Sequence, residues 1–146
     1  MDKQVQETEM KNPLEDLFEE ESQVSAHGDV TLANLVKPYL YLGKKTRKII
    51  LRDDAFNLPV KLRILLLFMG SLALKRLGSG EGTFSQKEII EYFSQYGVPE
   101  GTIKVSLKQL RDDRLITEAE ASRYMTGYDK LSKIQMELSK HGRSEN

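Results

Sequence analysis

The fold is decided by residues 85–116, which read SQKEIIEYFSQYGVPEGTIKVSLKQLRDDRLI. Ser85 and Glu88 have the spacing of a capping box, in which each side chain accepts a hydrogen bond from a backbone N–H that the first helical turn leaves unpaired. Apolar residues follow at helical spacing: Ile89, Ile90 and Phe93. The stretch therefore predicts a helix that begins just after Ser85 and has one apolar face.

A second helix is predicted after a short turn. Gly97-Val98-Pro99 ends the first helix, because Gly adopts the left-handed C-terminal conformation at little cost and Pro cannot continue the hydrogen-bond ladder. The next helix begins near Pro99 or Glu100 and places three aliphatic residues on one face: Ile103, Leu107 and Leu110. Two short helices joined by a Gly-containing turn form the helix-turn-helix pattern.

The pattern resembles the winged helix-turn-helix family, in which "TV…L..L….GLI" is a frequent signature. The residues that match its spacing are Thr102-Ile103, Leu107, Leu110 and Leu115-Ile116. The resemblance implies a mainly α-helical α+β fold with a small β-hairpin wing, whose strands lie at 115–117 and 123–126 around a turn at 118–122. It also implies that the second helix enters the major groove of DNA, which is wide enough to admit a helix.

The sequence departs from the family pattern at the turn, in the second helix and at the wing. Arg114 stands where the family often has Gly, and Val105 stands where many relatives carry a basic or polar group. Glu118 and Glu120 lie at the wing tip, where phosphate would repel them. These departures argue against contact through the wing and weaken direct base readout.

Candidate DNA contacts follow from helical geometry. Burial of the aliphatic stripe turns Lys104 and Lys108 together toward solvent, where they suit phosphate or guanine edges, although an ordinary solvated helix face has the same pattern. Thr102 lies near the helix N-terminus, where free N–H groups favour an anion, and Gln109 suits adenine. The further candidates are Val105 on the same face, Ser85, Gln86 and Lys87 for backbone contact or capping alone, and Arg123 for the minor groove.

The expected domain has a long helix at each end. Residues 57–77 form the first, with Asn57 as its cap, and its middle is apolar around nearly the whole circumference, so it must be buried on more than one side. The last helix runs from Gly127 to about His141 with an apolar stripe that either covers the core or pairs with a symmetry mate. Either helix is therefore a candidate homodimer contact.

A basic extension precedes the long helix. Residues 31–36 suggest a short helix, and 39–42 and 46–51 suggest a hairpin. Six cations lie within 16 residues: Lys37, Lys44, Lys45, Arg47, Lys48 and Arg52. With Tyr39 and Tyr41 they suit a phosphate-binding surface, for which Lys44, Lys45, Arg47 and Lys48 are the candidate contacts; a lysine-rich loop kept soluble by its charges is the alternative.

An acidic N-terminal arm balances this charge. Residues 1–30 carry nine acidic and two basic side chains, a net charge of −7, whereas the rest of the chain carries 20 basic and 13 acidic side chains, a net charge of +7. We expect residues 1–28 to be disordered in isolation. Leu14, Leu17 and Phe18 would share one helical face. The arm is a docking peptide for a protein partner, a cover for the chain's own basic surface, or a solvated tail.

No enzyme chemistry is expected. The chain has no Cys, and its two histidines lie near its ends, so no catalytic, cofactor-binding or metal-binding site is predicted. No secretory signal is seen. The longest apolar run, 64–74, spans 11 residues, whereas a membrane span needs about 20. A cytoplasmic, nucleoid-associated location is expected.

The predicted organisation has four segments. Residues 1–28 form the acidic arm, 29–56 the basic extension, 57–126 the winged domain, and 127–146 a C-terminal helix with a frayed tail. The predicted function is binding of double-stranded DNA, as in a dimeric transcriptional regulator. The alternative is a winged-helix module that binds proteins in a transcription, replication or partition assembly, since a fold does not fix a function.

Overall fold

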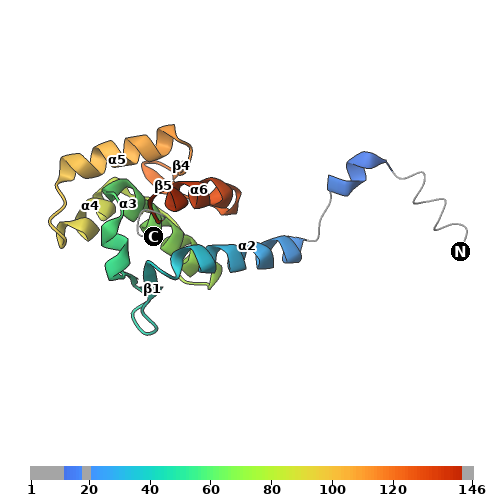
Figure 1. Cartoon of the computed structure of the whole chain (residues 1–146), viewed down its shortest axis with the longest axis horizontal. Coiled ribbons are helices and arrows are strands. Elements are labelled where there is room, and N and C mark those ends of the chain that lie inside the picture. The colour runs from blue at the N-terminus through green and yellow to red at the C-terminus, as the bar shows by residue number, and fades with distance from the viewer. Residues whose placement is uncertain (1–11, 18–20, 143–146) are drawn as a thin grey trace, which may run out of the picture.

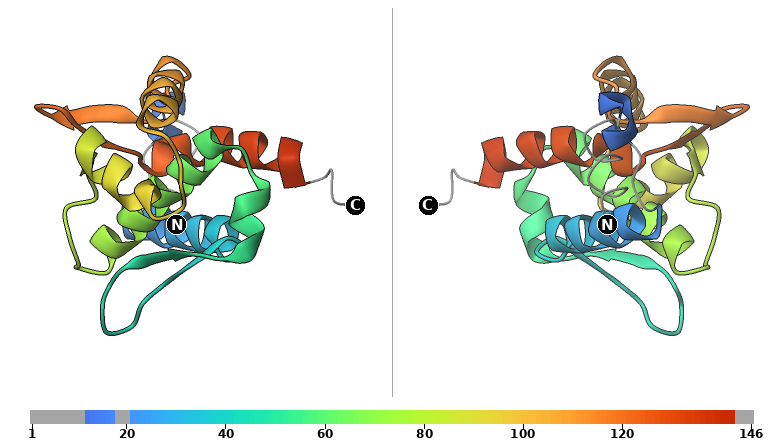
Figure 2. Two further views of the ribbon diagram at one scale, coloured as in Figure 1. Left: turned by 90° about the vertical axis from the view of Figure 1, so that its left-hand side faces the viewer. Right: turned by 90° about the vertical axis from the view of Figure 1, so that its right-hand side faces the viewer.

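A computed structural model describes residues 12–17 and 21–142 of the chain. The expected mainly helical α+β fold is confirmed, with two small antiparallel sheets packed among the helices (Figures 1 and 2). The elements in chain order are η1 (Pro13–Leu17), α2 (Glu21–Val36), β1 (Leu40–Leu42), β2 (Ile49–Leu51), η2 (Asp53–Asn57), α3 (Val60–Arg76), β3 (Phe84–Ser85), α4 (Gln86–Ser94), α5 (Glu100–Asp112), β4 (Thr117–Glu120), β5 (Arg123–Met125), η3 (Tyr128–Lys130) and α6 (Leu131–Gly142).

Helix α3 is the centre of the core. Its residues Leu62 and 64–72 are buried, as the apolar circumference predicts, because α2, α5 and the β1–β2 hairpin all pack against it. The helix begins at Val60 with Pro59 as its N-cap, so the expectation that Asn57 caps it is wrong. Asn57 instead ends η2, and Arg63 secures that turn by donating to the carbonyl oxygens of Leu58 and Phe56.

Helix α2 corrects the expected N-terminal organisation. It begins at Glu21 instead of Thr31, so the boundary expected after residue 28 falls inside a helix. Gly28, Leu32 and Val36 form one buried row at four-residue spacing. An ideal Cβ on Gly28 would lie 2.5 Å from Cδ2 of Tyr128, so the glycine lets η3 pack directly on the α2 backbone.

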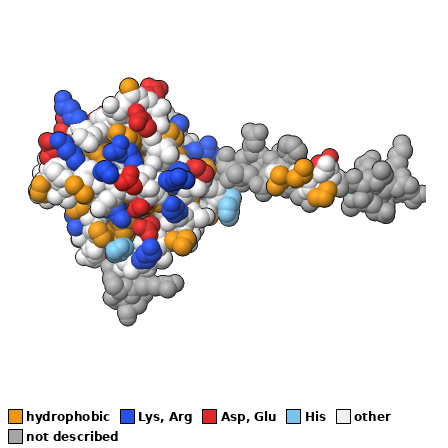
Figure 3. All heavy atoms as spheres, turned by 90° about the horizontal axis from the view of Figure 1, so that it is seen from above, with side chains coloured by type: hydrophobic (Ala, Val, Ile, Leu, Met, Phe, Trp, Pro, Cys, Tyr) orange, Lys and Arg blue, Asp and Glu red, His pale blue; other side chains and the backbone are white. Residues whose placement is uncertain are grey.

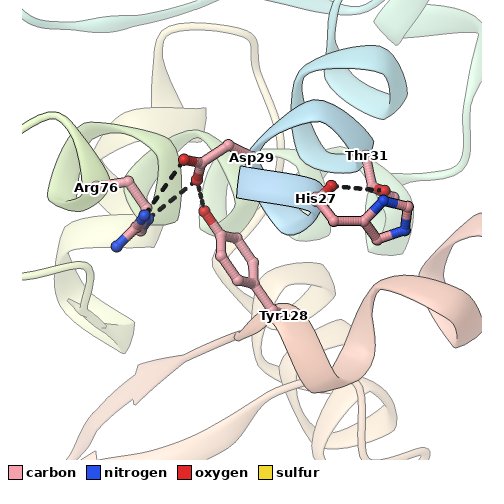
Figure 4. Close-up of polar contacts among 5 residues, drawn as sticks. All are labelled: His27, Asp29, Thr31, Arg76 and Tyr128. Atoms are coloured by element: carbon pink, nitrogen blue, oxygen red, sulfur yellow. Dashed lines mark hydrogen bonds and ion pairs between the residues drawn. The ribbon is translucent and has the colours of Figure 1, made fainter. Parts of the chain in front are cut away.

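Asp29 joins three elements that are distant in the sequence (Figure 4). Its two carboxylate oxygens accept hydrogen bonds from Arg76 Nε and Nη2 at 3.0 and 3.2 Å, and Tyr128 also donates its hydroxyl to Oδ1. The Arg76 guanidinium lies 5.5 Å from the centre of the Tyr128 ring. The cluster therefore links α2 to the end of α3 and to η3.

The three-stranded sheet has the order β3-β5-β4. Thr117 pairs with Met125 and Glu118 with Tyr124, which confirms a hairpin, but the strand begins at Thr117 and extends to Glu120. Leu115 and Ile116, expected in that strand, instead pack into the core before it. The element order from α3 to β5 is therefore helix, strand, helix, helix, strand, strand.

Helix α6 covers the domain's own core. Its stripe of Leu131, Ile134 and Leu138 is buried, which resolves the two alternatives for this helix. The apolar middle of α3 is buried within the same chain. The apolar stripes of α6 and α3 are therefore both covered within one chain. Among the described residues, no helix has the length and apolar character that a bilayer crossing requires.

Candidate nucleic-acid interface

The capping box of α4 is confirmed. Ser85 Oγ accepts from Glu88 N at 3.2 Å, and Glu88 Oε1 accepts from Ser85 N at 2.9 Å. The hydrogen bond from the Ser85 backbone lowers the pKa of Glu88, with partial burial acting against it and the positive charge of Arg123 acting with it. Of the expected contacts here, Lys87 is exposed, whereas Ser85 and Gln86 are half-buried. The start of α4 is therefore held by its own side chains.

Helix α5 lies as its sequence pattern predicts. Gly97 has φ 75°, which forms the turn, and α5 follows from Glu100. Ile103, Leu107 and Leu110 are fully buried against α3 and α4. The five candidate contacts on its outer face are all exposed: Thr102, Lys104, Val105, Lys108 and Gln109.

The two lysines of this face are paired within their own helix. Lys104 Nζ lies 2.9 Å from Glu100 Oε2, and Lys108 Nζ lies 3.2 Å from Asp112 Oδ2. All four side chains are exposed, and such pairs contribute only about 0.3–0.5 kcal/mol, so the lysines can exchange partners. Seen from above, the face presents basic and acidic side chains interspersed (Figure 3). Its positive charge is largely compensated.

Arg123, the residue suggested for the minor groove, lies partly buried on β5 and is held by partners within the chain. Its Nε donates to Thr83 Oγ1 at 2.8 Å, its Nη2 donates to the Thr83 carbonyl at 3.1 Å, and Nη2 lies 2.9 Å from Glu88 Oε1. These partners hold the guanidinium between β5 and the start of α4. Along β4, Glu118 and Glu120 remain exposed.

The departures from the family pattern have visible consequences. Arg114 has φ 61°, the left-handed conformation that glycine adopts without strain, so the position does require what Gly supplies. Val105 is 58% exposed on the outer face of α5. An apolar side chain therefore lies in the middle of the exposed side of α5.

The basic extension forms the expected hairpin. Leu40 pairs with Leu51 and Leu42 with Ile49. The four candidate contacts at its tip are exposed: Lys44, Lys45, Arg47 and Lys48. Across residues 12–17 and 21–142, none of these four cations forms an ion pair.

The hairpin and α5 lie at opposite ends of the molecule. Figure 1 shows α5 at the top and the hairpin at the bottom, and the side views of Figure 2 show the same separation. The basic hairpin and the exposed side of α5 therefore do not form one continuous surface. The hairpin packs on α3 through Ile49 at Gly70, which turns its tip away from α5.

A groove beside the hairpin was not anticipated from the sequence. It has a volume of about 630 Å³ and lies between β2, the end of α3, the 79–84 loop and α4. Tyr92 of α4 and Tyr96, in the turn just after α4, line it. The Tyr92 hydroxyl donates to the Ile49 carbonyl at 2.7 Å, and burial raises the pKa of Tyr92. In the sequence, the four-residue spacing of Tyr92 and Tyr96 is the feature that could have indicated this groove.

No group of three or more acidic or histidine side chains within the described ranges is arranged to hold a metal ion. His27 accepts a hydrogen bond from Thr31 through its carbonyl oxygen (Figure 4).

A scan against protein-family models, a search of curated proteins and a search of solved structures each found no match.

Proposed function

We propose that the chain binds double-stranded DNA through a winged helix-turn-helix formed by α3, α4, α5 and the β3–β5 sheet. The observation that supports this most is α5 itself, whose aliphatic side is buried while its outer side is exposed along its 13 residues. At about 1.5 Å per residue the helix is roughly 20 Å long, and the major groove, about 12 Å wide, admits a helix.

In this proposal the outer side of α5 enters the major groove. Lys104 and Lys108 leave Glu100 and Asp112 for phosphate or guanine, and Thr102 binds phosphate near the helix N-terminus. Lys87, exposed at the start of α4, contacts the backbone beside the groove. A transcriptional regulator with these contacts acts in the cytoplasm, on the nucleoid.

The test compares two double variants that lose the same charge at opposite ends. Affinity for a random duplex is measured by fluorescence anisotropy over a salt series. Lys104→Ala with Lys108→Ala should weaken binding and reduce the salt slope by about two, since each phosphate contact contributes about one. The matched control, Lys44→Ala with Lys45→Ala, should leave both nearly unchanged. Equal losses from the two variants would contradict contact through α5.

A third variant tests the compensating acids. Glu100→Gln with Asp112→Asn removes the intrahelical partners, so the lysines meet phosphate without competition and two repulsive charges disappear. Duplex affinity should rise at low salt, and the gain should shrink as salt increases. An unchanged affinity would show that phosphate does not approach these residues.

The second candidate function is protein binding through the same face. It is favoured by the paired lysines, the exposed Val105 and the acidic β4 strand. Glu118→Lys with Glu120→Lys separates the two proposals. If α5 binds DNA, the basic wing should tighten duplex binding; if the face binds a protein in a transcription, replication or partition assembly, the variant should gain no salt-dependent duplex affinity.

A further inference from the structure

The groove beside the hairpin has an apolar floor and a basic rim. Its apolar lining includes Ile50, Leu74, Phe84, Tyr92 and Tyr96. Arg47 and Lys48 form the hairpin side, and Glu81 lies in the loop that also lines it. A volume of about 630 Å³ falls within the range of about 300–1,000 Å³ typical of ligand-binding clefts. The lining suits an apolar group that carries negative charge on one side.

The wall formed by Tyr92 of α4 and by Tyr96, in the turn after it, is held in place before any ligand binds. The Tyr92 and Tyr96 rings have their centres 5.9 Å apart, and the Phe56 ring lies 5.0 Å from Tyr96. The hydrogen bond from Tyr92 to Ile49 fixes that ring against β2. A wall that is ordered in advance lowers the entropic cost of binding.

A segment with complementary chemistry lies near the N-terminus, at η1. Leu14 and Leu17 of η1 are 66% and 78% exposed, and they lie three residues apart, on one side of a helical turn. Glu15 and Asp16 lie between them in the sequence, and Glu19, Glu20 and Glu21 follow. The segment combines two uncovered aliphatic anchors with a strong negative charge.

We propose that the Pro13–Leu17 segment of one copy of the chain docks in the groove of a second copy. Leu14 and Leu17 bind against the apolar floor, and the neighbouring carboxylates face Arg47 and Lys48. This is the recognition of an amphipathic helical segment by an apolar groove. It does not depend on what α5 binds.

The direction of α2 favours a second copy over the chain's own groove. Helix α2 has 16 residues and is about 24 Å long. In Figure 1 its first turns extend beyond the body, away from the hairpin. The chain's own segment would have to turn back along α2, whereas a neighbour can receive it directly. With one segment and one groove per chain, exchange closes a two-fold dimer if reciprocal and otherwise builds open chains.

The test uses two full-length variants with opposite defects. Leu14→Asp with Leu17→Asp destroys the segment and keeps the groove; Arg47→Glu with Lys48→Glu destroys the groove and keeps the segment. Sedimentation velocity over a concentration series should show self-association of the wild-type protein and a monomer for each variant alone. An equimolar mixture of the two variants should form heterodimers, because it contains one intact segment and one intact groove.

The matched control reverses the same charges elsewhere. Lys104→Glu with Lys108→Glu, on α5, should self-associate as the wild type does, and circular dichroism checks that every variant is folded. A wild-type protein that stays monomeric at all concentrations, or a mixture that does not associate, would overturn the proposal. A labelled peptide of residues 12–21 that binds the Leu14→Asp, Leu17→Asp variant but not a monomeric wild type would assign the groove to the chain's own segment, which also overturns it.

Discussion

The two basic surfaces of this protein differ in how their charge is compensated. On α5, Lys104 and Lys108 each have a carboxylate four residues away on the same helix. At the hairpin tip, Lys44, Lys45, Arg47 and Lys48 have no such partner in the described part of the chain. The two surfaces look similar when only their cations are counted. The electrostatic potential that a ligand meets depends instead on the local net charge, which differs between them.

The two surfaces also differ in how they pack against the core. Helix α5 is fixed by a stripe of three fully buried aliphatic residues. The hairpin is fixed through its strands, where Ile49 lies against Gly70 of α3, and the 43–48 loop extends into solvent. Helix α5 is rigidly packed, and the positive charge of its exposed side is balanced by carboxylates. The hairpin loop extends into solvent and its positive charge is not balanced within the described residues, so the two surfaces suit different partners.

The largest effect on stability is expected from loss of the packing of α5 against the core. Leu107→Ala should lower the free energy of unfolding by about 2–5 kcal/mol, because it leaves a cavity under α5. Val105→Ala, on the exposed side of the same helix, should change it by less than about 0.5 kcal/mol. Urea unfolding followed by circular dichroism measures both. Similar losses would show that α5 is not held by its inner face.

A substitution at Gly70 tests how the hairpin packs against α3. An ideal Cβ there would lie 2.9 Å from Ile49 Cγ2 and 3.0 Å from Cγ1, so Gly70→Ala should destabilise the protein by about 1–3 kcal/mol, although alanine gains about 1 kcal/mol in helix propensity. In the Ile49→Ala background the same change should be much less harmful. A double-mutant cycle in urea measures the coupling; additive losses would contradict the close contact.

A smaller effect is expected where each surface contains an arginine in the left-handed conformation. Arg114, after α5, has φ 61°, and Arg47, at the hairpin tip, has φ 58°. Replacing either with Gly should stabilise the protein by about 1 kcal/mol, because the left-handed strain is relieved. Arg111→Gly, inside α5, should instead destabilise by about 1 kcal/mol. Only Arg47→Gly should also weaken self-association, because only Arg47 lines the groove.

The smallest effect is the pH dependence of the capping box at α4. The folded pKa of Glu88 is below its ordinary value of 4.5, so its contribution to stability is present above that value and is lost as pH falls through the folded pKa. Glu88→Gln keeps an acceptor for Ser85 N but has no charge for Arg123. The wild-type protein should therefore lose more stability than the variant between about pH 6 and about pH 3. Parallel thermal-unfolding curves for the two would contradict this.

The sequence predicted the segment around the turn well and the N-terminal third poorly. Helix α4, its capping box and the inward stripe of α5 follow from spacings of three and four residues, which the chain itself displays. Helix α2 was placed ten residues too late, because its buried row contains Gly28, which carries no hydrophobic signal. That glycine is used for close packing against Tyr128.

The candidate site was predicted in its parts but not in its arrangement. Thr102, Lys104, Val105, Lys108 and Gln109 are exposed as expected. The sequence suggested Arg123 for the minor groove, yet its guanidinium binds Thr83, 40 residues away. No local spacing indicated that the hairpin and α5 lie at opposite ends of the molecule. No rule of local spacing indicates which distant partner a side chain will meet.

By itself the sequence determined the helix-turn-helix from Ser85 to Asp112, because hydrogen bonds and apolar spacing within a few residues are sufficient to specify it. Only the tertiary structure decided the roles of residues whose partners lie far along the chain. Tyr92 binds Ile49 across 43 positions and Tyr128 binds Asp29 across 99. Such contacts form only when packing of α3 against its neighbours brings those segments together, and that same packing creates the groove and separates the two basic surfaces.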